Sequence, residues 1–208
     1  MDLATISCLL APYAQLDERQ LRLTSIYIDL LLKWNERINL TAVRGPEEIV
    51  ARHFGESFFA AEIFGSQAPV LHGIDLGSGA GFPGIPLAIS MPDASFALIE
   101  SQQKKATFLK EVIFALGLRN ITVFAGRAED YPEQADLVTM RAVERFEKTL
   151  PIAAQLTQPG ARIALMIGAS QLEQANELAK DVKWQQSVHV PGGHSRILLV
   201  GTRDVKVG

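Results

Sequence analysis

From residue 70 onward, short apolar runs alternate with helical segments, and this alternation constrains the fold more than any other feature of the chain. Each apolar run is bracketed by turn residues and has the length of a buried strand. The runs cover residues 70–77, 95–101, 120–126, 135–142 and 161–168. Strands that alternate with helices form a mostly parallel sheet with right-handed crossovers and helices on both faces. We therefore predict an α/β fold.

The residues that precede this series have a different, helical pattern. Residues 17–65 carry apolar side chains at helical spacing, and Asp17 with Gln20 three positions later forms a capping-box signature. Proline is favoured in the first turn of a helix, so a second helix is expected to begin at Pro46. It is expected to end at Gly65. This block predicts a helical region in front of the sheet.

The end of the chain predicts one more element. Residues 186–202 contain two extended runs around a Pro-Gly-Gly turn, which is typical of an antiparallel hairpin that closes the sheet. A chain of 208 residues is the size of one ordinary domain. We therefore treat residues 1–208 as a single domain, with residues 1–66 as an N-terminal helical extension and residues 67–208 as the α/β core.

Composition limits the classes of function. The single cysteine and the absence of Cys/His clusters at ligand spacing predict no metal site. The first apolar run is too short for a membrane span or signal peptide, so we expect a cytoplasmic protein without a membrane partner. The net charge is −3, so a nucleic-acid-binding surface would need a local basic patch. The candidate basic residues are Lys33, Arg37, Arg44, Lys104, Lys105, Lys110, Arg145 and Lys148.

The segment that follows the first strand is rich in glycine. Residues 75–84 read DLGSGAGFPG, which contains the Asp-x-Gly-x-Gly-x-Gly pattern typical of S-adenosylmethionine methyltransferases and an overlapping Gly-x-Gly-x-x-Gly dinucleotide pattern. Pro83 and Pro86 remove N–H donors that a pyrophosphate would use, which favours the first pattern. The candidate cofactor contacts in this loop are Asp75, Gly77, Ser78, Gly79 and Gly81.

Two later segments add candidates for cofactor binding. Glu100 ends the second predicted strand, 23 residues after Gly77, near the spacing of an acid that accepts hydrogen bonds from ribose hydroxyls. Both candidate cofactors contain a ribose, so Glu100 does not decide between them. In a methyltransferase, Ala128 and Glu129 after the third strand would border the adenine.

If the chain transfers a methyl group, the missing motifs restrict the acceptor. Carbon-5 methylation of a pyrimidine requires a nucleophilic cysteine beside the cofactor, and Cys8 lies far upstream in the sequence. The fourth strand is not followed by the Asn/Asp-Pro-Pro-Tyr turn of adenine-N6 enzymes. A ring nitrogen such as guanine N7 has an unprotonated in-plane lone pair, so it needs in-line alignment and no general base.

Five stretches together resemble a known family. They are KWNERINLTAV (33–43), EEIVARHFGES (47–57), DLGSGAGFPGIPLAI (75–89), KKATFL (104–109) and RA (141–142). In this order they are similar to the GidB/RsmG family of bacterial small-subunit ribosomal RNA guanine-N7 methyltransferases. The resemblance covers most of the chain.

The resemblance implies a class I methyltransferase with a mostly parallel, seven-stranded, Rossmann-like sheet. It implies S-adenosyl-L-methionine as the cofactor and N7 of a guanine in 16S ribosomal RNA as the acceptor, with ribosomal RNA or the small ribosomal subunit as partner. We expect a monomer. By resemblance, cofactor contacts fall on Gly77, Phe82, Ala128, Glu129 and Arg141. The candidate residues for substrate positioning are Asn39, Arg52, His53 and Arg141, with Thr41 beside them.

The chain departs from the family pattern at several positions, and alternatives remain open. The family commonly has aspartate where this chain has Glu100, and lysine where it has Ile167. Arg52 and Glu56 could instead form a simple i,i+4 ion pair on one helix. The alternative functions are methylation of a small molecule or protein, an NAD-dependent oxidoreductase, and an RNA-binding relative without activity.

Overall fold

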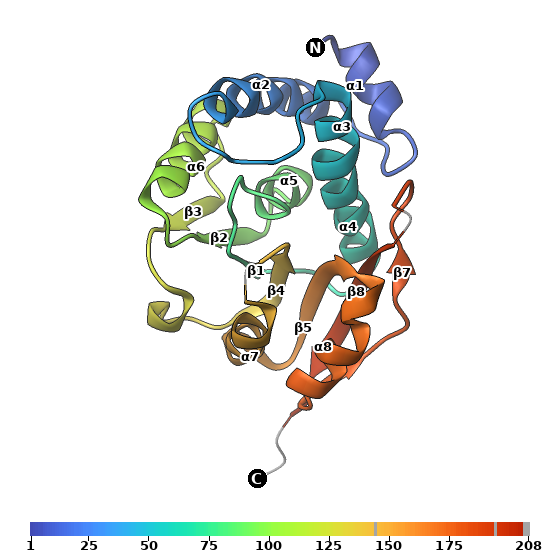
Figure 1. Ribbon diagram of the computed structural model, residues 1–208, viewed down its shortest axis with the longest axis vertical. Helices are drawn as coiled ribbons and strands as arrows, with labels where there is room; N and C mark the ends of the chain where they lie inside the picture. The colour runs from blue at the N-terminus through green and yellow to red at the C-terminus, as the bar shows by residue number, and fades with distance from the viewer. Residues whose placement is uncertain (144, 194, 206–208) are drawn as a thin grey trace.

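The computed structural model describes residues 1–143, 145–193 and 195–205, and a single mixed sheet runs through it (Figure 1). Its path of seven strands follows the order β3 (Ile121–Phe124), β2 (Ser95–Ile99), β1 (His72–Leu76), β4 (Ala135–Arg141), β5 (Thr157–Gly168), β8 (Arg196–Arg203) and β6 (Val182–Trp184). The first five strands pair in parallel, and β8 is antiparallel to both of its neighbours. The predicted α/β class and seven-stranded path are confirmed.

An eighth, two-residue strand completes the sheet. β7 (Val188–His189) pairs with β8 in the antiparallel direction, so the predicted C-terminal hairpin is present. His194, within that predicted hairpin, lies outside the described residues.

Helices precede the sheet and connect its strands. Those before the sheet are α1 (Leu3–Leu10), α2 (Glu18–Asn35), α3 (Pro46–Ile49), the π-helical turn η1 (Val50–Gly55) and α4 (Glu56–Gly65). Those between strands are α5 (Gly84–Ser90), α6 (Gln103–Leu116), η2 (Ala128–Asp130), α7 (Phe146–Leu156), η3 (Ala169–Gln171) and α8 (Leu172–Leu178). Across the described part of the chain, every helix is too short or too polar to span a bilayer.

Local signals explain where the first helices begin. Asp17 caps α2 with the predicted capping box, because its carboxylate accepts from the Gln20 amide at 2.7 Å and the Gln20 side chain accepts from the Asp17 amide at 2.9 Å. Pro46 opens the next helical segment as predicted. The sequence did not predict α1, whose N-cap Asp2 accepts from the Thr5 amide at 2.9 Å.

The two faces of the sheet carry two separate clusters of buried side chains. In β2, Phe96 and Leu98 pack into a cluster with α1, α2, α4, α5 and α6, whereas Ala97 and Ile99 pack into one with α7 and α8. Successive residues of a strand point to opposite faces, which accounts for this division. Helices therefore lie on both faces, with α7 and α8 on the side away from α2 (Figure 1).

The topology places a ligand-binding edge at the carboxyl end of β1. β1 lies between β2 and β4, so the strand order reverses at the β1/β4 pair. In open α/β sheets, ligands bind outside the carboxyl ends of the strands at such a switch point. The glycine-rich loop follows β1 at this place.

Gly84, the first residue of α5, packs directly against the sheet. Its amide donates to Asp75 Oδ2 at 3.2 Å. A Cβ atom at this position would lie 2.8 Å from Asp75 Cβ and closer still to Leu98. Only glycine therefore lets α5 approach β1 and β2 at this distance.

We expect Gly84→Ala to lower the free energy of unfolding by about 1–3 kcal/mol, because overpacking displaces the helix or the strand. Gly65→Ala is the matched control, since Gly65 ends α4 and has no atom within 4 Å of an added Cβ. Urea denaturation measures both variants. Equal midpoints for the two alanine variants would contradict the packing argument.

Candidate active site

A cavity of about 990 Å³ opens at the carboxyl ends of the parallel strands. Its walls come from the loops after β1, β2, β3 and β4, and from residues 40–45 and η1 of the N-terminal helical region. The site is therefore shared between the sheet and the helices that precede it.

Most of the predicted site residues line this cavity. Those in its wall are Gly77, Ser78, Gly79, Phe82, Glu100, Ala128, Glu129, Arg52, His53 and Arg141. Three predicted residues are not among the residues of the wall. Asn39 is exposed and accepts from Arg44 at 3.3 Å, Asp75 is buried and accepts from Thr139 Oγ1 at 2.9 Å, and Gly81 packs under Tyr27.

The glycine loop exposes bare backbone to the cavity, and Glu100 holds it in place. Gly77 and Gly79 have φ angles of +71° and +56°, a conformation that side-chain-bearing residues rarely adopt. Glu100 accepts from the Gly79 amide at 2.9 Å with one carboxylate oxygen and from the Gln102 amide at 2.7 Å with the other. This acid is thus part of the loop's support as well as of the cavity wall.

Tyr27 of α2 supports the same loop through a second contact. Its hydroxyl donates to the backbone carbonyl of Ala80, and its ring stacks on Phe82 with centroids 5.3 Å apart. Gly81, with a φ of +90°, has room for no side chain because the Tyr27 hydroxyl occupies the space. The sequence pattern did not identify Tyr27, since an aromatic residue on an amphipathic helix has the pattern of an ordinary core residue.

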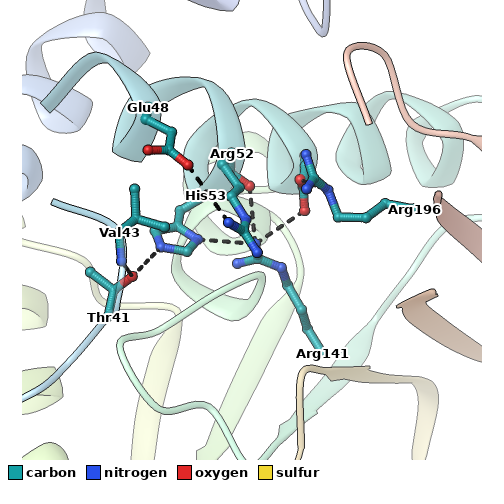
Figure 2. Close-up of polar contacts among 8 residues, drawn as sticks. Thr41, Val43, Glu48, Arg52, His53, Arg141 and Arg196 are labelled. Carbon is teal, nitrogen blue, oxygen red and sulfur yellow. Dashed lines mark hydrogen bonds and ion pairs between the residues drawn. The ribbon is translucent and has the colours of Figure 1, made fainter. Parts of the chain in front are cut away.

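Arg141, the last residue of β4, is the centre of a polar network in the cavity wall (Figure 2). Its Nη2 lies 3.0 Å from the Arg52 carbonyl oxygen, 3.0 Å from His53 Nδ1 and 3.1 Å from Glu56 Oε2. The guanidinium also lies over the Phe82 ring, 5.9 Å from its centroid. Arg141 thereby connects the end of β4 to η1 and α4.

Glu56 is buried and neutralises two arginines. Its side chain is 2% exposed, and its second oxygen forms an ion pair with Arg196 at the start of β8. The alternative that Arg52 pairs with Glu56 is wrong, because Arg52 instead pairs with Glu48 at 3.6 Å on the exposed side of the helix. Both Glu56 oxygens are occupied by these two partners, of which Arg141 is 11% exposed and Arg196 is 33% exposed. No local spacing identifies Arg196 as a member of this network.

His53 is held between Arg141 and Thr41 as a neutral ring. Its Nε2 lies 2.6 Å from Thr41 Oγ1, and the ring stacks on Phe82 with centroids 5.1 Å apart. Burial, together with the positive charges of Arg141, Arg52 and Arg196, lowers the pKa of His53 to about 3. The imidazole is therefore uncharged at neutral pH.

A second cavity, of about 320 Å³, lies behind Arg141. Ile167, at the position where the family commonly has lysine, lines this second cavity and is not in the wall of the first. Arg196 lines it as well, so a cation is present beside the position of the missing lysine.

Comparison with protein families assigns the chain. The family model described as GidB, rRNA small subunit methyltransferase G, matches residues 20–197. The chain belongs to this family. The match includes α2 from Gln20 onward, the glycine loop and the whole wall of the large cavity.

Individual relatives agree with the family. The ribosomal RNA small subunit methyltransferase G of Roseiflexus sp. (strain RS-1) is 40% identical over 202 residues, covering 89% of this chain and 84% of that protein. The protein of the same description from Solibacter usitatus is 41% identical over 160 residues, 74% of this chain and 75% of that one. The Aquifex aeolicus relative is 43% identical over 145 residues, 68% and 74% of the two chains.

Solved structures agree on the fold. The ribosomal protein L11 methylase of Lactobacillus delbrueckii subsp. bulgaricus matches with a TM-score of 0.63 and 15% identity, covering 74% of this chain and 80% of that one. TYW2 of P. horikoshii, in complex with MeSAdo, matches with a TM-score of 0.59 and 19% identity, covering 74% and 63%. The chain thus has the class I methyltransferase fold that the sequence predicted.

These findings confirm that the chain is a methyltransferase of the small-subunit ribosomal RNA family with the fold of S-adenosylmethionine-dependent enzymes. They do not favour the oxidoreductase alternative or a methyltransferase of small molecules or proteins. The roles of the individual site residues remain predictions.

We expect the stability of the protein to depend on His53 in mild acid. As the pH decreases from about 6.5 to 4.5, the unfolded chain gains a proton at His53 that the folded chain does not bind. The free energy of unfolding therefore decreases as the pH decreases, by up to about 1.4 kcal/mol per pH unit. His53→Gln lacks this pH-dependent contribution to the free energy of unfolding, because glutamine does not titrate.

Urea denaturation at several pH values tests this expectation through the difference between wild type and His53→Gln. Burial raises the pKa of Asp75 to about 6, but Asp75 is present in both proteins and cancels in the difference. The stability advantage of the wild type should shrink as the pH falls. A constant difference would show that the ring is protonated in the folded state.

Proposed function

We propose that the protein transfers a methyl group from S-adenosyl-L-methionine to N7 of a guanine in 16S ribosomal RNA, by in-line transfer without a general base. The observation that carries the proposal is the composition of the large cavity. Its wall combines the glycine loop and Glu100 with residues 40–45, Arg52 and His53. Residues of the family's two most specific stretches therefore lie in the wall of one site.

The cavity suits the cofactor in size and in chemistry. A volume of about 990 Å³ is at the upper end of small-molecule sites, enough for an adenosyl group and an incoming base. Gly77 and Gly79 present backbone without side chains. Each Glu100 oxygen has accepted one backbone hydrogen bond and retains acceptor capacity for a ribose hydroxyl. When bound, the cofactor supplies an electrophilic methyl group on a sulfonium.

The polar side chains of the cavity position the substrate rather than remove a proton from it. His53 is the residue whose ordinary pKa suits a general base, but Arg141 and Thr41 contact both of its ring nitrogens. A guanine N7 has a free lone pair and requires no base, which agrees with this arrangement. Alignment of reacting groups alone supplies up to about 7–11 kcal/mol.

A basic rim supports RNA as the acceptor. Four of the eight candidate basic residues line the cavity, namely Arg44, Lys105, Arg145 and Lys148. Phosphate contacts position a nucleic acid, and RNA enzymes reach bases in unstacked loops. We place the protein in the cytoplasm as a monomer whose single domain, residues 1–208, acts on ribosomal RNA or the small ribosomal subunit.

Glu100→Gln should weaken the binding of S-adenosylhomocysteine by about tenfold, the equivalent of one lost charge-assisted hydrogen bond. An amide group also repels one of the two backbone N–H donors that Glu100 accepts. Glu62→Gln, on the exposed face of α4, is the control. Isothermal titration calorimetry measures both affinities, and NADH serves as the competing ligand. Unchanged affinity in Glu100→Gln would remove this residue from the cofactor site.

The acceptor can be tested directly with a tritiated cofactor. Naked 16S ribosomal RNA, assembled small subunits and a mixture of small metabolites are offered separately, and the RNA comes from cells that lack this enzyme. We expect label in RNA. Reduction followed by aniline treatment should cleave the RNA at the labelled nucleotide, because this treatment cleaves RNA at 7-methylguanosine. Label only in metabolites or protein would contradict the proposal.

A further inference from the structure

The hydrogen bonds around His53 can run in only one direction. A guanidinium group donates and never accepts, so His53 Nδ1, 3.0 Å from Arg141 Nη2, must be the unprotonated nitrogen. A neutral imidazole carries one N–H, which we therefore assign to Nε2. The tautomer of His53 is set by Arg141.

This direction determines what the Thr41 hydroxyl can do. Its oxygen lies 2.6 Å from His53 Nε2 and 3.1 Å from the Val43 amide, and both of these groups donate to it. A hydroxyl oxygen accepts two hydrogen bonds and donates one. Both acceptor positions of Thr41 are filled, so its remaining capacity is a single O–H donor. Within the described residues that donor has no acceptor in hydrogen-bonding distance.

The position of Thr41 is fixed as well as its polarity. The Asn35 side chain accepts from the Leu40 and Thr41 amides, each at 3.0 Å, which holds the loop against the end of α2. Thr41 lies in the wall of the large cavity, which Gly77 and Gly79 of the glycine loop also line. Figure 2 shows it next to the His53 ring, on the side away from Arg141. The Thr41 hydroxyl is therefore a hydrogen-bond donor in the cavity wall whose position is fixed and for which the described residues provide no acceptor.

We propose that Thr41 donates a hydrogen bond to O6 of the target guanine and selects guanine over adenine. This inference rests on the proposed N7 methylation. Guanine presents N7 and O6 as neighbouring acceptors on one edge, whereas adenine presents N7 beside an amino donor. A base that directs N7 at the cofactor therefore brings its 6-substituent to the same wall. Guanine satisfies the Thr41 donor, and adenine opposes it with a second donor.

Two buried hydroxyls beside the glycine loop already have acceptors within the protein. Ser78 donates to the Asp75 carbonyl at 2.8 Å, and Thr139 is buried and donates to Asp75. Arg141 is engaged with three acceptors around η1. Unlike these groups, Thr41 has a hydroxyl that accepts from two donors and whose hydrogen has no acceptor among the residues that the structure describes.

Two variants of Thr41 separate the hydroxyl from the shape of the side chain. Thr41→Val removes the hydroxyl at constant shape and should lower kcat/KM for 16S ribosomal RNA by about 10–100-fold, the effect of one unsatisfied hydrogen bond. Thr41→Ser keeps the hydroxyl and should stay within about threefold of wild type. The affinity for S-adenosylhomocysteine should be the same in both. Thr107→Val, on the exposed side of α6, is the control.

Replacement of the target guanine by a base without O6 distinguishes a direct contact from a structural role. Once the methylated guanine is mapped, a ligated RNA carries 2-aminopurine there, which retains N7 and lacks O6. The wild type should lose activity on this RNA. Thr41→Val should have the same activity on the 2-aminopurine RNA as on the guanine RNA, because the contact is already absent in this variant. If the 2-aminopurine substitution lowers the activity of Thr41→Val by the same factor as that of the wild type, there is no contact between Thr41 and O6. If the wild-type enzyme methylates no RNA, the proposed function itself fails, and this inference fails with it.

Discussion

The Glu56 carboxylate lies buried between two guanidinium groups, and the arrangement of the site depends on it. Arg141 comes from the end of β4 and Arg196 from the start of β8, so one acid joins α4 to two strands that are distant in sequence. Such a buried ion pair adds little net stability, because desolvation offsets the attraction. Loss of one partner leaves an uncompensated charge and typically costs about 3–5 kcal/mol. The network therefore fixes positions more than it stabilises the fold.

The position of Glu56 determines which groups in the cavity wall donate and which accept hydrogen bonds. Glu56 holds Arg141, Arg141 keeps His53 neutral and sets its tautomer, and His53 turns the Thr41 hydroxyl into a donor. Arg141 donates to Glu56 on one side and to His53 on the other, and His53 in turn donates to Thr41. A site built in this way recognises acceptor atoms on a base and offers no proton acceptor at His53. That property suits a nucleophile with a free lone pair.

The N-terminal helices are part of the site and not an attachment to it. Side chains of α1, α2 and α4 share one buried cluster with α5, α6 and one face of the sheet. Tyr27 of α2 and Glu100 after β2 hold neighbouring residues of the glycine loop, Ala80 and Gly79. The cofactor loop would lose one of these supports without the helical region, which explains physically why both regions occur within one family match.

The sequence by itself determined the alternating strands, the Asp17 capping box, the glycine loop and the acid that follows the second strand, because each depends on residues close together in the chain. It also supplied the family motifs. Only the tertiary structure decided that Glu56 pairs with Arg141 and Arg196 and not with Arg52, and that Tyr27 supports the loop. These partners lie 53 to 140 residues apart. Local periodicity carries no information on such pairs, since long-range contacts depend on how whole elements pack.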